Sequence, residues 1–224
     1  MGAYVSLLER LHWLGHASFL LDGPPVLYFD PWKLKESALS RSQGQLPQAD
    51  IILISHEHHD HCSPADVKRI SGSGTVIIAS AGSAKKLSGD VRTLHPGEST
   101  TIGQVKIDAV PAYNIDKFRS PGHPFHPKEA EHVGYVVTVE GVRLYFAGDT
   151  DHIPEMAEIA CDVALLPVGG TYTMDAREAA QAAADIAPDV AVPMHWGAGV
   201  VGSRADAERF RDLYDGQVVI LTPE

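Results

Sequence analysis

Runs of consecutive apolar residues, many of them β-branched, recur along the chain between turn-forming residues. Such runs predict strands that are buried in a sheet. We predict strands over His12–Leu21, Val26–Asp30, Ile51–Ser55, Thr75–Ala79, Val105–Val110, Gly134–Val139, Val142–Ala147, Val163–Val168, Val190–Met194 and Val218–Leu221. Glu140-Gly141 is a suitable two-residue turn, and it predicts a hairpin over residues 134–147.

Segments with helical character lie between the strands, mainly in the second half of the chain. We predict helices over Pro64–Ile70, Ala81–Leu87, Pro154–Ile159, Asp175–Ile186 and Ala205–Tyr214. Asp175 can cap the fourth helix with Glu178 three residues later, as a capping box requires, and Ser203 and Asp206 repeat this spacing. Strands with interleaved helices predict an α/β protein in which sheets pack together and helices cover them.

The segment Ala112–Val133 lacks a clear hydrophobic period and contains several prolines and three histidines. A segment of this length without regular structure is usually functional or mobile in a compact domain. Because it lies between two predicted strands, we expect it to form a lid or a wall of a binding pocket.

A dense cluster of metal-binding residues follows the apolar run Ile51–Ile54. Residues 56–61 read HEHHDH, at the point where the strand ends and the chain turns. Residues in H-x-H spacing point the same way on an extended backbone, and Asp60 and His61 fall on the turn beyond. Imidazole and carboxylate bind divalent metals well, so the cluster predicts a metal site with ligands for two neighbouring ions. The alternative is a solvated polar loop, which explains poorly so many ligating residues in a row.

Three further metal-binding residues come directly after predicted strands: Asp30, Asp149 and His195. Taken singly, the two aspartates could serve turns and the histidine could be a buried core residue. Together with the cluster, a binding site explains all three, because residues at the ends of several strands converge on one rim of a sheet.

The H-x-H-x-D-H pattern of residues 56–61, with Asp30, Gly148-Asp149-Thr150 and His195, resembles the signature of the metallo-β-lactamase-fold hydrolases. The resemblance covers nearly the whole chain, beginning at Gly15-His16-Ala17. The Gly-His-Ala and Gly-Asp-Thr forms are similar to a small branch that includes L-ascorbate-6-phosphate lactonase-like proteins.

The resemblance implies a single domain over residues 1–224. The implied fold is a four-layer αββα sandwich of two mixed β-sheets flanked by helices, with the site at one edge of the sheets. It also implies six metal ligands: His56 and His58 for a first ion, Asp60, His61 and His195 for a second, and Asp149 bridging both. Asp30 would accept a hydrogen bond from a ligand histidine and fix its tautomer. His16 would lie near the rim as a contact of a ligand or of the substrate, or else be an ordinary turn histidine.

One position departs from the family pattern. The family usually supplies a third histidine to the first ion, and the matching position here is Asn114. Its carbonyl oxygen is a weaker zinc ligand than imidazole. His126 could take this place from the long segment, with His123 or His132 as further alternatives. We therefore expect the first ion to be bound more weakly, or the protein to work with one ion.

The predicted ligand set indicates hydrolysis. A hydroxide formed between two cations near neutral pH would attack a carbonyl or phosphorus, and Asp60 would orient it and carry its proton. We predict a metal-dependent hydrolase of a small ester, lactone or phosphorylated substrate. The alternatives are a phosphodiesterase or RNA-processing nuclease of the same fold, and a non-catalytic metal-binding or ligand-sensing protein. Gly169-Gly170-Thr171-Tyr172 lacks a P-loop lysine; we expect it to let backbone approach the pocket, with Tyr172 as a substrate contact.

Composition narrows the cofactors and partners. Ligands with nitrogen and oxygen donors favour two divalent ions, zinc first, with manganese or iron as alternatives. The formal charge of −11 argues against nucleic-acid binding. Two cysteines without C-x-x-C spacing, and no apolar run long enough to span a membrane, suggest a cytoplasmic protein. The expected partner is a small-molecule substrate. The sequence leaves homo-oligomer formation open.

Overall fold

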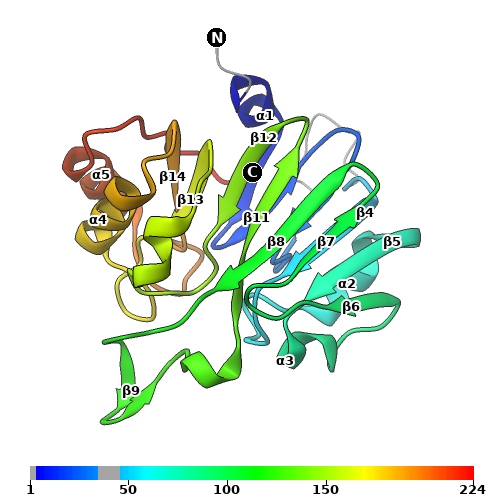
Figure 1. The fold of residues 1–224 in the computed structure, drawn as a ribbon, viewed down its shortest axis with the longest axis horizontal. Helices are drawn as coiled ribbons and strands as arrows, with labels where there is room; N and C mark the ends of the chain where they lie inside the picture. The colour runs from blue at the N-terminus through cyan, green and yellow to red at the C-terminus, as the bar shows by residue number, and fades with distance from the viewer. Residues whose placement is uncertain (1–3, 35–45) are drawn as a thin grey trace.

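Two mixed six-stranded sheets pack on each other in the computed structural model, which describes residues 4–34 and 46–224 (Figure 1). The N-terminal sheet has the spatial order β1 (Leu11–Gly15), β2 (Ser18–Leu21), β3 (Leu27–Phe29), β4 (Ala49–Ile54), β5 (Ser71–Ala79) and β6 (Asp90–Thr93). The C-terminal sheet has the order β14 (Val190–Met194), β13 (Val163–Pro167), β12 (Val142–Phe146), β11 (Val133–Val139), β8 (Val105–Pro111) and β7 (Ser99–Ile102). Strands β3 to β6 are parallel, as are β12 to β14, and the other neighbours in both sheets are antiparallel.

Helices cover the outer faces of the sheets. The described helices are α1 (Tyr4–Arg10), α2 (Pro64–Ile70), α3 (Ala81–Ala84), α4 (Ala176–Ile186) and α5 (Arg204–Leu213), with 3₁₀ helices at Lys128–Ala130 and Pro154–Glu158. α3 lies against β5 and β6, whereas α4 and α5 lie against β13 and β14 (Figure 1). The predicted arrangement of two mixed sheets flanked by helices is confirmed. In the part of the chain that the structure describes, no helix has the length and apolar character needed to cross a bilayer.

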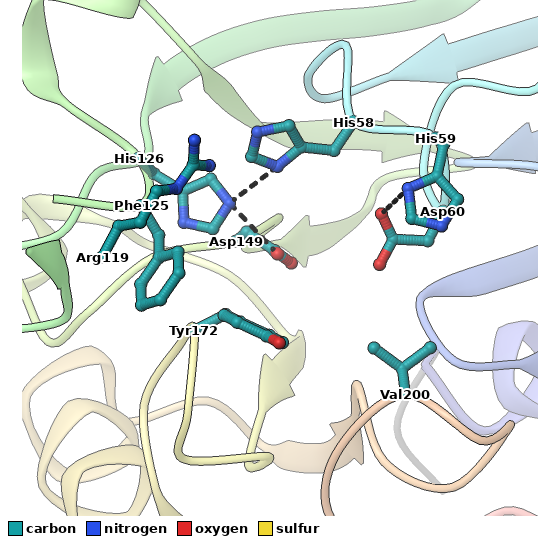
Figure 2. A pocket seen from close by; sticks show the side chains of 9 residues that line it. All are labelled: His58, His59, Asp60, Arg119, Phe125, His126, Asp149, Tyr172 and Val200. Carbon is teal, nitrogen blue, oxygen red and sulfur yellow. Dashed lines mark hydrogen bonds and ion pairs between the residues drawn. The ribbon is translucent and has the colours of Figure 1, made fainter.

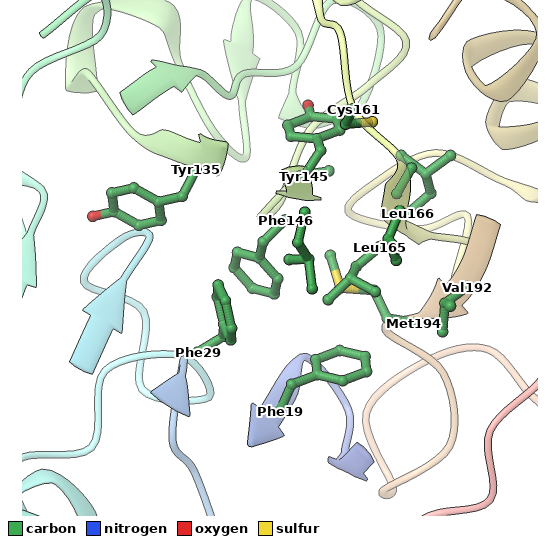
Figure 3. Close-up of a cluster of buried hydrophobic side chains, with 14 of the residues drawn as sticks. Phe19, Phe29, Tyr135, Tyr145, Phe146, Cys161, Leu165, Leu166, Val192 and Met194 are labelled. Atoms are coloured by element: carbon green, nitrogen blue, oxygen red, sulfur yellow. The ribbon is translucent and has the colours of Figure 1, made fainter. Parts of the chain in front are cut away.

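The main apolar core lies between the two sheets. Phe19 and Phe29 of the N-terminal sheet contact Phe146 of the C-terminal sheet, with ring centroids 6.5 and 5.3 Å apart (Figure 3). All three side chains are fully buried, and burial of such a side chain stabilises the fold by about 1.5–3 kcal/mol. This packing fixes the position of one sheet on the other and therefore the relative positions of their strand ends.

Strand β4 shows why its apolar run is continuous. Ile51 and Leu53 belong to the core between the sheets, whereas Ile52 and Ile54 belong to a second cluster that includes α2 residues. Successive side chains of a strand point to opposite faces, so a strand covered on both faces needs apolar residues at every position. The predicted buried strand is confirmed.

Both predicted capping boxes are present. The Asp175 carboxylate accepts hydrogen bonds from the backbone N–H groups of Arg177 and Glu178, and the Glu178 carboxylate accepts one from the Asp175 N–H. At α5, the Asp206 carboxylate accepts a hydrogen bond of 2.8 Å from the Ser203 N–H. These contacts satisfy N–H groups that a helix start leaves without partners.

Several predicted elements differ from the structure. The strand predicted over His12–Leu21 is the hairpin β1–β2, because Gly15 and His16 turn the chain with φ of 103° and 54°. Val218–Leu221 makes a single bridge, from Val218 to Ala191, instead of a full strand. The predicted helices Ala81–Leu87 and Pro154–Ile159 are respectively one short turn, α3, and a 3₁₀ helix. Helix α1 and strands β6 and β7 were not predicted.

An excursion over residues 112–132 leaves the C-terminal sheet after β8 and returns at β11. It contains the small hairpin of β9 (Phe118–Ser120) and β10 (His123–Pro124), which projects from the body of the molecule in Figure 1. Its two ends are neighbours, because Pro111 and Val133 pair across β8 and β11. The excursion is therefore anchored on adjacent strands and lies at the edge where the candidate site forms.

Candidate metal centre

Histidine and aspartate side chains gather where strands of both sheets end. Asp30 follows β3 and His56 comes two residues after β4, and these parallel neighbours have their carboxyl ends at the same edge. In the C-terminal sheet, Asp149 lies beyond the end of β12 and His195 follows β14. The packing of the two sheets brings these strand ends, far apart in sequence, to one place.

The first donor group consists of His56, His58 and His126, each of which offers a ring nitrogen within 4.8 Å of the others. Nδ1 of His58 lies 3.1 Å from Nε2 of His56 and 3.2 Å from Nε2 of His126. His56 and His126 are buried, and His58 is half-buried. Three imidazoles that converge in this way can serve as ligands of one cation.

The second donor group consists of His16, Asp60, His61 and His195, whose donor atoms also lie within 4.8 Å of one another. Nε2 of His16 lies 3.2 Å from Oδ2 of Asp60. The rings of His61 and His195 stack with centroids 5.5 Å apart. All three histidines are fully buried, so this group is enclosed more completely than the first.

Asp149 lies between the two donor groups. Its Oδ2 is 3.4 Å from Nε2 of His126 and 3.2 Å from Nε2 of His195. Its Oδ1 is 3.3 Å from Nε2 of His61. The carboxylate thus contacts histidines of both groups and is placed to serve two ions at once.

Asp30 stands behind the second donor group. Its carboxylate accepts a hydrogen bond of 2.7 Å from Nδ1 of His61, and others from the backbone N–H and hydroxyl of Ser55. Because Nδ1 of His61 carries the hydrogen in this bond, Nε2 is the nitrogen free to face the centre of the group. Asp30 therefore fixes the orientation and tautomer of a donor histidine.

Several buried atoms that face the centre have no hydrogen-bond partner within the described residues. They are Nε2 of His16, His61 and His195, and Oδ1 of Asp149. A buried polar atom without a partner costs about 1–3 kcal/mol, so a fold rarely gathers several without a ligand for them. Neutral imidazoles and carboxylates at such positions suit zinc, manganese or iron ions. The donors present therefore fit divalent metal ions.

Burial keeps most of the donor imidazoles neutral. It lowers the pKa of His126 to about 3 and, with the nearby His195, that of His16 to about 4. It also holds the pKa of His56 well below its ordinary value. A neutral imidazole offers a lone pair to a cation without first losing a proton, so these residues are ready to bind metal near neutral pH.

His61 differs from these three histidines. Burial alone would lower its pKa, but Asp149 and Asp30 outweigh this effect and raise the pKa of His61 well above its ordinary value. In turn, His195 and His61 hold the pKa of the buried Asp149 carboxyl well below its usual range. The two carboxylates on either side of His61 therefore favour its protonated form.

Asn114 supports His126 and does not join the donors. Its side-chain oxygen accepts hydrogen bonds of 2.8 and 2.9 Å from the backbone N–H and Nδ1 of His126. Its amide nitrogen donates to the Asp151 carboxylate and to the Tyr172 backbone oxygen, both at 2.9 Å. The expected Asn114 contact with an ion is therefore replaced by a contact with His126. The amide leaves Nε2 of His126 to face His58 and Asp149.

Three residues of the centre have a left-handed backbone: His16 with φ 54°, Asp30 with φ 40° and His195 with φ 58°. Such a conformation costs a residue with a Cβ roughly 1–2 kcal/mol. A backbone hydrogen bond of 2.9 Å from the His195 N–H to the His16 oxygen ties two of these turns together. The surrounding fold therefore holds these side chains in positions that an extended strand would not give them.

The structure places the remaining sequence candidates around the centre. His16 is fully buried within the second donor group, deeper than the rim position expected for it. The side chain of His59 is 88% exposed. His132 is buried behind the first group, with its ring 5.0 Å from that of His56, and His123 is exposed on β10.

The glycine-rich segment after β13 approaches the centre closely, as expected. A Cβ on Gly169 would lie 2.5 Å from the backbone oxygen of His195, so only glycine fits there without a shift. The approach carries Tyr172 to the edge of the site.

A pocket of about 310 Å³ opens over the two donor groups (Figure 2). Its lining residues are His58, His59, Asp60, Arg119, Phe125, His126, Asp149, Tyr172 and Val200. Arg119 and Phe125 come from the excursion and were not among the sequence candidates. No local signal marks them, because their place depends on how the excursion folds over the sheet edge.

Comparison with known proteins identifies the family to which the chain belongs. A family model described as a β-lactamase superfamily domain matches residues 10–195. A UPF0173 metal-dependent hydrolase of Thermococcus kodakarensis is 35% identical, over 96% of this chain and 97% of the relative. One from Pyrococcus horikoshii is 34% identical, again over 96% of this chain and 97% of the relative.

Solved structures agree with this fold. A protein of Parabacteroides distasonis, described as a candidate metal-dependent hydrolase, has a TM-score of 0.76 and 35% identity over 95% of this chain and 93% of its own. A metallo hydrolase of Ignicoccus hospitalis has a TM-score of 0.73 over 95% of this chain and 94% of its own. Its identity of 23% supports the fold alone.

Proposed function

This chain belongs to the metallo-β-lactamase superfamily and is a metal-dependent hydrolase. From this premise we propose that two divalent metal ions act together in cleaving a small ester, lactone or phosphorylated substrate. The observation that carries the proposal is the position of Asp149, which contacts histidines of both donor groups. A carboxylate shared in this way is suited to hold two ions side by side.

The proposed ligands follow the two donor groups. They are His56, His58 and His126 for the first ion, Asp60, His61 and His195 for the second, and Asp149 for both. His16 lies within reach of the second ion or supports it through Asp60. Zinc is the favoured metal for this donor set, with manganese and iron as alternatives.

Bound ions would lower the pKa of water and polarise the bond to be cleaved. The protein's own part is to position the reactants. Burial would raise the pKa of Asp60, but the nearby imidazole of His16, whose Nε2 lies 3.2 Å from Oδ2 of Asp60, outweighs it and holds this pKa well below the usual range. Asp60 therefore stays ionised and acts as an acceptor that orients an attacking water molecule, and it is poorly suited to store a proton.

The size of the pocket favours a small substrate. A volume of about 310 Å³ lies at the lower end of the range of about 300–1,000 Å³ that small-molecule sites occupy. The formal charge of −11 opposes long nucleic-acid substrates. A phosphorylated lactone remains one member of the proposed substrate class.

The proposal can be tested with the purified chain loaded with zinc, manganese or iron. We would measure metal content by mass spectrometry and hydrolysis of para-nitrophenyl esters, lactones and a phosphodiester, for the wild type and for Asp60→Ala. Asp90→Ala is the matched control, since Asp90 is exposed and paired with Arg92. We expect two ions per chain, and hydrolysis that Asp60→Ala lowers and chelation abolishes. Saturation at one ion, or hydrolysis that survives both treatments, would contradict the proposal.

A further inference from the structure

One wall of the pocket is aromatic and carries a positive charge. Phe125 from the excursion and Tyr172 from the segment after β13 meet edge to face, with ring centroids 4.8 Å apart. The guanidinium of Arg119 lies 5.7 Å from the Phe125 ring. Figure 2 shows this wall on the His126 side of the pocket, with Val200 and Asp60 on the other side.

The charge of Arg119 has no carboxylate partner within the described residues. By contrast Arg10, Arg92 and Arg204 pair with carboxylates at 2.7 to 2.9 Å. Arg119 is exposed at the pocket and is the only lysine or arginine among its lining residues. A guanidinium in this position keeps its donors free for an anion, which it can bind through two parallel hydrogen bonds.

The hairpin that carries Arg119 has a firm base. The ammonium group of Lys117 lies 2.7 Å from the carboxylate of Glu178 on α4. The backbone N–H of Phe125 donates a hydrogen bond of 3.1 Å to the Lys117 oxygen, which closes the hairpin. The backbone that carries Arg119 is therefore held in place before a ligand arrives, so binding needs to order little more than the side chain.

Resting on the proposed function, we infer that the substrate carries a second, non-reacting anionic group, a carboxylate or phosphate, which Arg119 binds beside the Phe125–Tyr172 pair. The substrate would then lie across the pocket in one direction. Its anionic end and its apolar or planar part contact the excursion, and its reacting bond faces Asp60 and Asp149. This class includes half-esters of dicarboxylic acids and lactones that bear an acidic group.

Matched esters test the inference directly. Para-nitrophenyl glutarate ends in a carboxylate, para-nitrophenyl valerate ends in a methyl group, and para-nitrophenyl phosphonobutyrate replaces the carboxylate with a phosphonate. The variants are Arg119→Ala, Arg119→Lys and Arg119→Glu, with Arg92→Ala as the control on an arginine far from the pocket. Metal content of every variant shows that the centre is intact.

We expect Arg119→Ala to raise KM for the glutarate ester by roughly 10- to 100-fold, because charge-assisted hydrogen bonds are lost. kcat should change by no more than about twofold, since Arg119 does not face the reacting bond. The valerate ester should be unaffected, Arg119→Lys should fall between, and Arg119→Glu should prefer the valerate ester. A larger effect on the phosphonate than on the carboxylate would identify phosphate as the recognised group.

Equilibrium binding separates this inference from the proposed function. Terephthalate and para-carbamoylbenzoate both keep one carboxylate for bound ions and differ only in the charge of the far end. We expect the loaded wild type to prefer terephthalate and Arg119→Ala to lose this preference, whether or not any ester is cleaved. Failure to cleave any ester would count against the proposed function alone. Equal behaviour of wild type and Arg119→Ala toward both compounds would overturn the inference.

Discussion

The two donor groups of the metal centre are built in different ways. The second group uses turns and strand ends that the two sheets hold in place, and all of its histidines are fully buried. The first group takes His126 from the excursion, and a single amide, that of Asn114, orients this histidine. The comparison shows that the packed sheets alone form one half of the centre, whereas a segment outside the sheets completes the other half.

The two donor groups also differ in the number of carboxylates that they contain or contact. The second group contains Asp60 and has Asp30 behind it, whereas the first has imidazoles only and shares Asp149. Carboxylates neutralise a divalent ion, and fixed partners reduce the cost of ordering the ligands. We therefore expect the second ion to be held more tightly, and the first ion to exchange more readily.

The largest effect is expected from removing the residue that the two groups share. Asp149→Ala should weaken both ions and lower hydrolysis by at least about 10³-fold, because both groups lose a charged ligand. Metal content and initial rates check this. His59→Ala, a change of an exposed histidine in the same segment as the ligands, should keep two ions. Retention of both ions by Asp149→Ala would show that the groups are independent.

Removing one histidine from either group, in two separate variants, should show how strongly each group binds its own ion. His126→Ala should leave one tightly held ion per chain, whereas His195→Ala should weaken the second ion and leave the first group intact. Each change removes one imidazole and should lower hydrolysis by about 10²-fold or more. Titration with a competing chelator measures the two affinities. Equal losses in both variants would mean that the centre loads as one unit.

A subtler change tests the support of His126. Asn114→Ala should weaken the first ion by about 10- to 100-fold, the usual effect of removing a partner that orients a metal ligand. The second ion should be unaffected. His123→Ala is the control, because His123 is an exposed histidine of the same excursion. An unchanged affinity in Asn114→Ala would show that burial alone orients His126.

The smallest effect concerns protons. The pKa of His61 is raised, because Asp149 and Asp30 outweigh burial, whereas the pKa of His126 is about 3. Near neutral pH these shifts favour the protonated form of His61 and the neutral form of His126. Loading the second group, measured in His126→Ala, should release about one proton per ion, and loading the first group, measured in His61→Ala, should release almost none. Calorimetry in two buffers of different ionisation enthalpy gives these numbers, and equal release would contradict the assignment.

The parts of the fold that were predictable are those buried on both sides. The continuous apolar runs of β4 (residues 51–54), β13 and β14 signal their strands, because each position of these runs is buried. Strands β6 and β7 are partly exposed and carry polar residues, so their sequences show no clear hydrophobic pattern. Helix α1 has a single buried residue, Leu7, and no capping signal.

The candidate site likewise has residues that the sequence predicts and residues whose positions it does not predict. Residues 56–61 and the strand-end residues stand out because their types and positions suit metal binding. The choice between Asn114 and His126 depends on the path of the eleven excursion residues between them, 115–125, which carry no periodic signal. The depth of His16 depends on a left-handed turn and on the contact of its backbone with His195. These two features are set by tertiary packing, so the local sequence does not predict them.

The paired ends of the excursion also bear on how such enzymes diversify. Pro111 and Val133 face each other across two strands, so the segment between them can be exchanged without moving the sheet. That segment carries both Arg119 and His126. A new version acquired in evolution, or grafted from a relative, would change substrate preference and affinity for the first ion in a single event. Selection for a new substrate would therefore also act on the metal that the enzyme can use.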